Sequence, residues 1–107
     1  MNSINKLEKI INERKEIKSE GSYTCYLFEK GLDKILKKCG EECSEMIIAA
    51  KNGSKEEIVL ETSDLIYHIM VMLAQMEISF SEIDKELEFR AKKQMNLKEI
   101  KNTDLNS

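Results

Sequence analysis

The sequence has no proline and only four glycines among its 107 residues, and aromatic residues make up just 6% of it. A sheet with tight turns normally needs more of these turn-forming residues, so their scarcity argues against a β-rich fold. Charged residues are abundant, at 35%, a balance that suits amphipathic helices. At this length one domain is expected, and we predict an all-α fold, a bundle of four to five helices.

The chain also lacks a strong excess of either charge, with 17 basic and 20 acidic residues and a formal net charge of −3. This balance does not suggest nucleic-acid binding through a broad basic surface. No stretch reaches the ~18 uninterrupted apolar residues typical of a membrane-spanning helix. Residues 1–6 lack the apolar centre of a signal peptide. We therefore expect no nucleic-acid partner, no membrane segment and a cytoplasmic location.

The three cysteines form an odd set in a chain without an export signal, so reduced thiols are expected. Cys39 and Cys43 are one helical turn apart, a spacing that can suit a metal ion. Both also fall on the apolar side of their predicted helix, where free cysteine packs as a small hydrophobic side chain. We favour packing for both.

Apolar periodicity and capping residues divide the chain into helical segments. The predicted helices cover residues 3–18, 22–28, 32–51, 54–76 and 79–93. The second is only a short turn, and Ser3, Ser54 and Ser79 are placed to cap the first, fourth and fifth. Asn52-Gly53 stops the third helix, because both residues tolerate the left-handed conformation. Residues 1–93 then form one domain, and the polar residues 94–107 are expected to fray.

The helix predicted at 54–76 is apolar on three sides and carries a narrow polar stripe on the fourth. Such a helix is usually enclosed by other helices, and a chain this short has a modest core of its own. We therefore expect a homodimer to complete the bundle. The polar stripe consists of Glu57, Glu61, Asp64, His68 and Gln75.

Two acidic pairs flank the Asn52-Gly53 turn: Glu42 with Glu45 before it, and Glu61 with Asp64 after it. Side chains three residues apart share one face of a helix. The short loop makes the two long helices antiparallel, so the two pairs reach roughly the same level. We expect their four carboxylates to converge on one spot between the helices.

Four neighbouring carboxylates repel one another unless they hold protons or a cation. Oxygen ligands without cysteine favour Mg²⁺, with Mn²⁺ as an alternative, over zinc. Mg²⁺ commonly shares phosphate oxygens with a substrate, and lysines flank the acidic residues at Lys30, Lys34, Lys37, Lys38 and Lys51. This favours hydrolysis of a polyphosphate, in which the metal lowers the pKa of a bound water and a carboxylate takes its proton.

Three further polar residues have simpler interpretations beside the functional one. Glu41 faces nearly opposite to the apolar stripe and is either solvated or part of the site. Glu57 is better explained as a capping residue than as a ligand. A single histidine such as His68 is more often a hydrogen-bonding residue of the core or a neighbour of ligands than a ligand itself.

Glu42-x-x-Glu45 followed by Glu61-x-x-Asp64 resembles the paired acidic motif of the all-α nucleoside-triphosphate pyrophosphohydrolases, the MazG-like superfamily. Further strings narrow the resemblance to the phosphoribosyl-ATP pyrophosphatases of histidine biosynthesis, over about Leu7 to Arg90. These strings are Ser22-Tyr23-Thr24, Lys30 to Ile35, Lys37 to Glu42, Ile48 to Gly53 and Asp64 to His68.

This resemblance implies an intertwined helical dimer that hydrolyses phosphoribosyl-ATP, with magnesium, to phosphoribosyl-AMP and pyrophosphate. By matching position, the residues implied to hold the metal are Glu42, Glu45, Glu61 and Asp64. Glu41 is implied as a further ligand or base. The implied contacts to substrate phosphates are Lys37, Lys51 and Asn52. Many members are fused to a cyclohydrolase, and its absence here leads us to expect a stand-alone enzyme.

Three other functions are weighed against this one. A house-cleaning pyrophosphohydrolase of non-standard nucleoside triphosphates keeps the same acidic site and changes the substrate. A non-catalytic helical dimerisation module leaves the inward acidic stripe unexplained. A di-iron bundle needs Glu-x-x-His pairs, which are absent because the single histidine, His68, stands four residues after Asp64.

Overall fold

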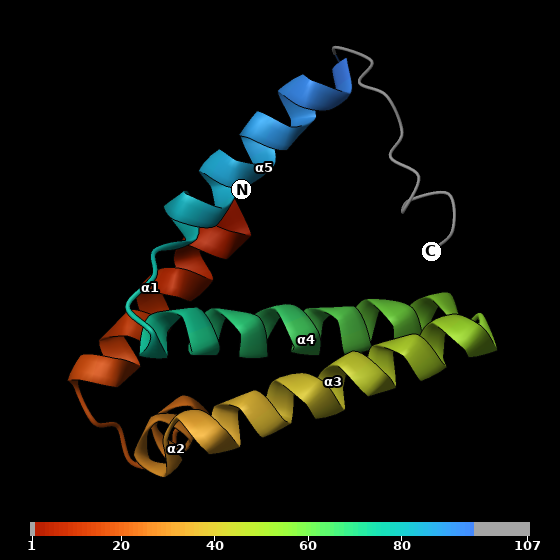
Figure 1. The fold of residues 1–107 in the computed structure, drawn as a ribbon. Coiled ribbons are helices and arrows are strands. Elements are labelled where there is room, and N and C mark those ends of the chain that lie inside the picture. Colours follow the sequence, from red (N-terminus) through yellow and green to blue (C-terminus); the bar gives the residue numbers. More distant parts are fainter. Residues whose placement is uncertain (1, 96–107) are drawn as a thin grey trace.

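The computed structural model describes residues 2–95 of the 107-residue chain (Figure 1). These residues form α1 (Asn2–Glu16), α2 (Tyr23–Lys30), α3 (Leu32–Asn52), α4 (Lys55–Gln75) and α5 (Phe80–Met95). The described part of the chain contains no strand, so the predicted all-α class is confirmed. None of the helices in it is long and apolar enough to cross a membrane.

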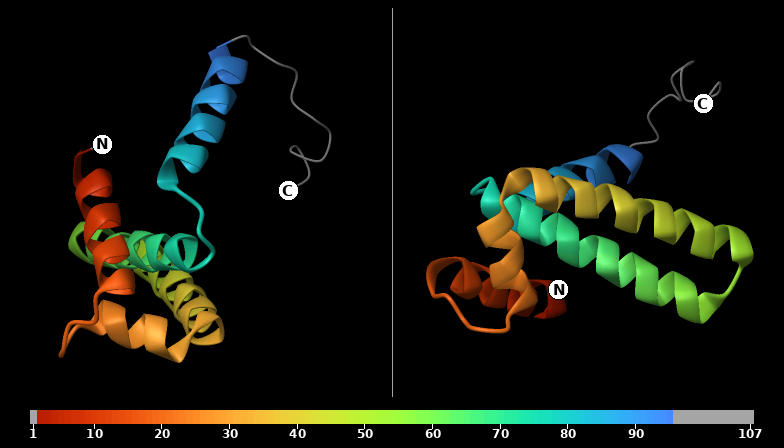
Figure 2. Two further views of the ribbon diagram at one scale, coloured as in Figure 1. Left: turned by 90° about the vertical axis from the view of Figure 1, so that its left-hand side faces the viewer. Right: turned by 90° about the horizontal axis from the view of Figure 1, so that it is seen from below.

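The helices α3 and α4 form a long antiparallel hairpin and make the most extensive contact in the molecule (Figures 1 and 2). Gly53 ends α3 with a φ of 76°, which glycine adopts without strain, and its N–H donates to the carbonyls of Ala49 and Ala50. Ser54 then caps α4, its hydroxyl accepting from the N–H of Glu57 at 3.3 Å. The predicted stop and cap are both confirmed.

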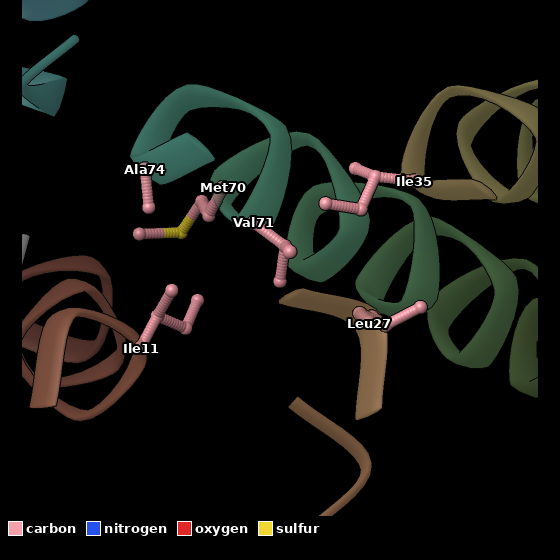
Figure 3. Close-up of a cluster of buried hydrophobic side chains, with 6 residues drawn as sticks. All are labelled: Ile11, Leu27, Ile35, Met70, Val71 and Ala74. Atoms are coloured by element: carbon pink, nitrogen blue, oxygen red, sulfur yellow. The ribbon is translucent and has the colours of Figure 1, made fainter. Parts of the chain in front are cut away.

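The buried core lies at the end of the hairpin where α3 begins and α4 ends. Six side chains from four helices form it: Ile11, Leu27, Ile35, Met70, Val71 and Ala74 (Figure 3). The partly buried Ile4, Leu7 and Phe28 pack against this cluster. The helices α1 and α2 therefore cover only the C-terminal half of α4.

Within one chain, α4 is not enclosed on all sides. Val59, Leu60 and Ile66 on α4 stay exposed, Leu60 by 59%, and so do Ile47 and Ile48 on α3. The cause is the position of α1 and α2, which leave the half of the hairpin next to Gly53 without a covering layer. This exposure agrees with the expectation that so short a chain does not enclose this helix by itself.

The last helix, α5, stands away from the others (Figure 2). In the described chain it has no extensive contact with any other helix. The apolar pattern predicts an inward face at Ile83, Leu87 and Ala91. Ile83 is half-buried, whereas Leu87 and Ala91 are exposed. The chain turns into α5 through Glu77, which has a φ of 59°, and the Oε2 atom of Glu8 accepts from the N–H of Phe80 at 2.7 Å.

Smaller differences concern the ends of the helices. The second helix is longer than the predicted short turn and is capped by Ser22, whose hydroxyl accepts from the N–H of Cys25 at 3.2 Å. The first helix starts at Asn2, so Ser3 lies inside its first turn and does not cap it. Since α5 continues to Met95, residues 96–107 of the predicted tail lie outside the described residues.

Candidate active site

Three acidic side chains meet between α3 and α4. Glu42 and Glu45 on α3 and Glu61 on α4 each offer one carboxylate oxygen, and these oxygens lie within 4.8 Å of one another. Glu42 is buried, Glu61 is half-buried and Glu45 is exposed. Over residues 2–95 this is the only such convergence of three or more His, Cys, Asp or Glu side chains. We call it the three-carboxylate group.

The short turn between the two helices sets this arrangement. Glu45 stands eight positions before Gly53 and Glu61 stands eight positions after it, so an antiparallel hairpin places them at one level. A cavity of about 230 Å³ opens beside them, lined by Glu45, Ile48, Ala49, Glu57 and Glu61. Glu57 thus reaches the edge of the site while its backbone is held by the Ser54 cap.

The three-carboxylate group fits a divalent cation. Glu42 Oε2 and Glu61 Oε2 are buried and have no hydrogen-bond partner in the described chain. A charged oxygen in that position has lost its hydration, and three adjacent carboxylates repel one another. A cation bound among them would satisfy both oxygens, and a donor set made only of oxygen suits Mg²⁺ or Mn²⁺.

Asp64 falls outside the three-carboxylate group. It stands eleven positions after Gly53, level with Glu42 at eleven positions before it, but its side chain is exposed whereas Glu42 is buried. The structure therefore brings together three of the four carboxylates that the spacing placed at one spot. Equal height on two helices does not make two side chains point toward each other.

Lys38 is the basic residue that contacts the three-carboxylate group. Its Nζ lies 3.3 Å from Glu42 Oε1 and 3.3 Å from Glu41 Oε2. Its side chain is 23% exposed, against 69% for Lys37, which reaches only Glu41, at 4.0 Å. Burial acts to lower the pKa of Lys38, but the hydrogen bonds to Glu41 and Glu42 outweigh it, so the pKa is raised and the amine stays charged.

From the sequence, Lys38 is one of the flanking lysines and has no role of its own, and Lys37 is the expected phosphate contact before the acidic residues. The sequence feature that identifies Lys38 is its spacing, because it stands four residues before Glu42, the most buried acidic residue of the group. Glu41 is exposed and pairs with both lysines.

Two further residues named from the resemblance, Lys51 and Asn52, lie apart from the three-carboxylate group. Both are exposed at the C-terminal end of α3. Lys51 is six residues beyond Glu45, which is about 9 Å along the helix axis at 1.5 Å per residue. Any contact they make with a ligand at the group must come from a part of the ligand that extends toward the hairpin turn.

His68 is buried and held at both of its ring nitrogens. Nδ1 lies 2.7 Å from the backbone oxygen of Asp64, and Nε2 lies 3.0 Å from the hydroxyl of Tyr23 on α2. A carbonyl only accepts, so Nδ1 carries the hydrogen, and Nε2 of the neutral ring accepts from Tyr23. His68 therefore fixes α2 against α4 beside the acidic residues and is not placed as a metal ligand.

Aromatic packing surrounds this histidine. Tyr67 meets His68 edge-on with ring centroids 4.9 Å apart, and its hydroxyl bonds to Thr24 on α2. Burial raises the pKa of Tyr23, and the nearby Lys38 charge acts to lower it. Tyr23 thus bonds to the histidine and is near enough to Lys38 for the lysine charge to act on its hydroxyl.

Comparison with known proteins places the chain in a family. A family model described as phosphoribosyl-ATP pyrophosphohydrolase matches residues 4–91. The chain belongs to this family. The matched residues include the three-carboxylate group, Lys38, Tyr23 and His68, so the whole candidate site lies within the part shared with phosphoribosyl-ATP pyrophosphohydrolases.

Two individual relatives match over almost their whole length, and a third matches over part of its length. The chain is 55% identical over 102 residues to a phosphoribosyl-ATP pyrophosphatase of Clostridium botulinum strain Hall, covering 95% of this chain and 93% of the relative. It is 49% identical over 105 residues to that of Lactiplantibacillus plantarum, covering 95% and 99%. It is also 60% identical over 90 residues to the histidine biosynthesis bifunctional protein HisIE of Caldanaerobacter subterraneus, covering 84% of this chain and 44% of that protein.

Proposed function

We propose that this protein hydrolyses phosphoribosyl-ATP to phosphoribosyl-AMP and pyrophosphate, the second step of histidine biosynthesis. The family match over residues 4–91 carries the proposal. Relatives named for this activity align with almost the whole chain. The three-carboxylate group supports the same chemistry, because cleavage of a phosphoric anhydride is commonly assisted by a divalent cation on oxygen ligands.

The proposed cofactor is Mg²⁺, with Mn²⁺ as a substitute, held by Glu42, Glu45 and Glu61. When bound, the cation neutralises phosphate charge and lowers the pKa of the attacking water. Asp64 is the proposed fourth ligand, because it follows Glu61 by three residues on α4 and its exposed side chain is free to turn. Glu41, beside Lys38, is proposed as a further ligand or as the base that takes the proton of the water.

The residues that would receive the phosphates are proposed from charge and position. Lys37 is exposed four residues before Glu41. Lys51 and Asn52 lie toward the hairpin turn. A phosphate chain that lies along α3 meets these groups on either side of the three-carboxylate group, so they are proposed as substrate contacts.

We also propose that the protein works as a homodimer. Large apolar side chains are exposed along the hairpin, at Leu36, Ile47, Ile48, Val59, Leu60 and Ile66. An apolar face of this extent is normally covered by a partner. A second copy presents the same face, so that a symmetric pairing of two hairpins covers both. A cytoplasmic location fits the three free cysteines, Cys25, Cys39 and Cys43.

Pyrophosphate release from phosphoribosyl-ATP tests the proposal. Purified protein should release pyrophosphate with Mg²⁺ and stop when the metal is chelated. Non-standard nucleoside triphosphates, assayed in parallel, should be hydrolysed with a much lower kcat/KM. Folded protein that releases no pyrophosphate from phosphoribosyl-ATP, while it hydrolyses free nucleotides, would make the house-cleaning function the correct one.

A further inference from the structure

Lys38 forms the only ion pair with the three-carboxylate group among residues 2–95. Its Nζ is 3.3 Å from Glu42 Oε1, while the other oxygen of the same carboxylate, Oε2, is buried without a partner. The two oxygens of the Glu42 carboxylate therefore have different surroundings. One oxygen is satisfied by an ammonium group of the protein, and the other has no partner among residues 2–95.

This pair differs from an ordinary surface ion pair. The Glu42 side chain is only 8% exposed and that of Lys38 is 23% exposed, so neither charge is well hydrated. A lysine four residues before a glutamate is also the less favourable order on a helix, because it opposes the helix dipole. The contact is thus better explained by the need of a buried carboxylate for a counter-charge than by support of α3.

A divalent cation held by Glu42 would compete with the Lys38 ammonium for the charge of the same carboxylate. A cation held by Glu42, Glu45 and Glu61 would bring a second positive charge to a carboxylate that Nζ already contacts at 3.3 Å, and like charges repel each other. Lys38 already has a second partner, since Glu41 Oε2 is also 3.3 Å away and belongs to an exposed side chain. Its flexible stem allows the amine to leave Glu42 without a change in the backbone.

We propose that Lys38 is an internal counter-ion that holds Glu42 while the metal is absent, and that it exchanges Glu42 for a substrate phosphate when the metal binds. The inference rests on the proposed function. Free metal must displace a positive charge from the site. A metal ion that arrives bound to a polyphosphate brings negative charge with it, and the Lys38 ammonium then pairs with a phosphate. The site therefore discriminates against the free cation and favours the metal–polyphosphate complex, which couples the two binding events.

Two titrations of the intact protein test this exchange. Calorimetry measures the affinity for Mn²⁺ alone, and then the affinity for magnesium pyrophosphate. We expect Lys38→Met to bind Mn²⁺ about tenfold more tightly than the wild type and magnesium pyrophosphate about tenfold more weakly, within the usual range of couplings between linked ligands. Lys9→Met is the control, because it removes an exposed charge on α1, a helix without a residue in the three-carboxylate group, and it should leave both affinities within about twofold.

Opposite shifts in the two titrations are a result that a merely structural Lys38 would not produce. Lys38→Met with unchanged or weaker Mn²⁺ affinity overturns the inference, even if the wild type hydrolyses phosphoribosyl-ATP with Mg²⁺. A wild type that binds no Mn²⁺ overturns the proposed metal site itself, and the role of Lys38 with it. Circular dichroism confirms folding, and Lys38→Gln, which keeps a polar head, replaces the methionine variant if that variant does not fold.

Discussion

Glu42 and Glu61 each have a buried carboxylate oxygen without a hydrogen-bond partner in the described chain. Such an oxygen lowers the stability of the fold, so we explain it by the function of the site. The three-carboxylate group holds its oxygens within 4.8 Å of one another, an arrangement that is unfavourable until a cation is bound. At the scale of single residues, a substitution that removes one of these charges should thus weaken the site without weakening the fold.

Glu45→Gln separates these two effects, because Glu45 is exposed and the amide keeps its shape. We expect Mg²⁺-dependent kcat/KM to fall by about 10²-fold or more. The melting temperature without metal should stay equal or rise, since one repelling charge is gone. The increase in melting temperature on adding Mn²⁺ should shrink. Pyrophosphate release and thermal melts measure all three.

The control for this experiment is Glu56→Gln, an acidic residue of the first turn of α4 that lies outside the three-carboxylate group. It should keep its activity and its Mn²⁺-induced shift in melting temperature. Full activity in Glu45→Gln, with an unchanged shift, would remove Glu45 from the proposed site.

Tyr23→Phe removes the hydroxyl that donates to buried His68 Nε2. We expect the free energy of unfolding to fall by about 1–2 kcal/mol, because a buried acceptor is left without its donor. Urea unfolding measures the change. Tyr26→Phe on the same helix is the control, since Tyr26 is exposed, and it should change the value by less than about 0.5 kcal/mol. Equal losses in both variants would contradict a stabilising role for the Tyr23–His68 bond.

Sequence spacing predicted part of this site and missed the rest for a physical reason. Helical periodicity and a short turn fix the height and the approximate face of a side chain, which was enough to bring Glu45 and Glu61 together. They do not fix the direction that packing imposes, so they placed Asp64 with the other three carboxylates and did not single out Lys38 from the flanking lysines. The Tyr23–His68 contact spans 45 residues, and no local pattern encodes it.

At the scale of elements, the hairpin turn determines the register of the acidic pairs. Gly53→Ala should lower the free energy of unfolding by about 1 kcal/mol, because a Cβ is strained at a φ of 76°. Gly40→Ala, in the middle of α3, should raise it by about 0.5–1 kcal/mol, because an added Cβ meets no atom of the described chain within 4 Å. Urea unfolding measures the change in the free energy of unfolding for both variants. If the two changes have the same sign, one of the two explanations is contradicted.

The elements themselves were largely predictable. Asn52-Gly53 and Ser54 gave the ends of α3 and α4 to within one or two residues, because capping residues are local signals. For α5, the apolar pattern predicts an inward face at Ile83, Leu87 and Ala91, but within one chain only Ile83 is half-buried. An amphipathic pattern shows that one face of a helix is buried somewhere, but it does not say which chain buries it.

At the scale of the whole molecule, the uncovered hairpin predicts the assembly. Light scattering should give about twice the 12.4 kDa of one chain. Val59→Asp places a charge in the proposed interface and should weaken dimerisation at least about tenfold, since an unpaired charge is costly to bury there. Ile17→Asp is the control, because Ile17 is 71% exposed and lies beyond the end of α1. A wild type with the mass of one chain would contradict the dimer.

The hairpin also has a kinetic consequence. All three carboxylates lie between residues 42 and 61, on two consecutive helices joined by two residues, so little chain entropy is lost when they meet. Contacts this local form early in folding. Their mutual repulsion should then slow refolding, and Mn²⁺ should speed it, as stopped-flow refolding with metal or chelator would measure. If Mn²⁺ slows only unfolding, the carboxylates come together after the transition state. An ion that slows only unfolding stabilises the protein after it has folded. An ion that speeds refolding binds while the hairpin is forming and helps to bring the carboxylates together.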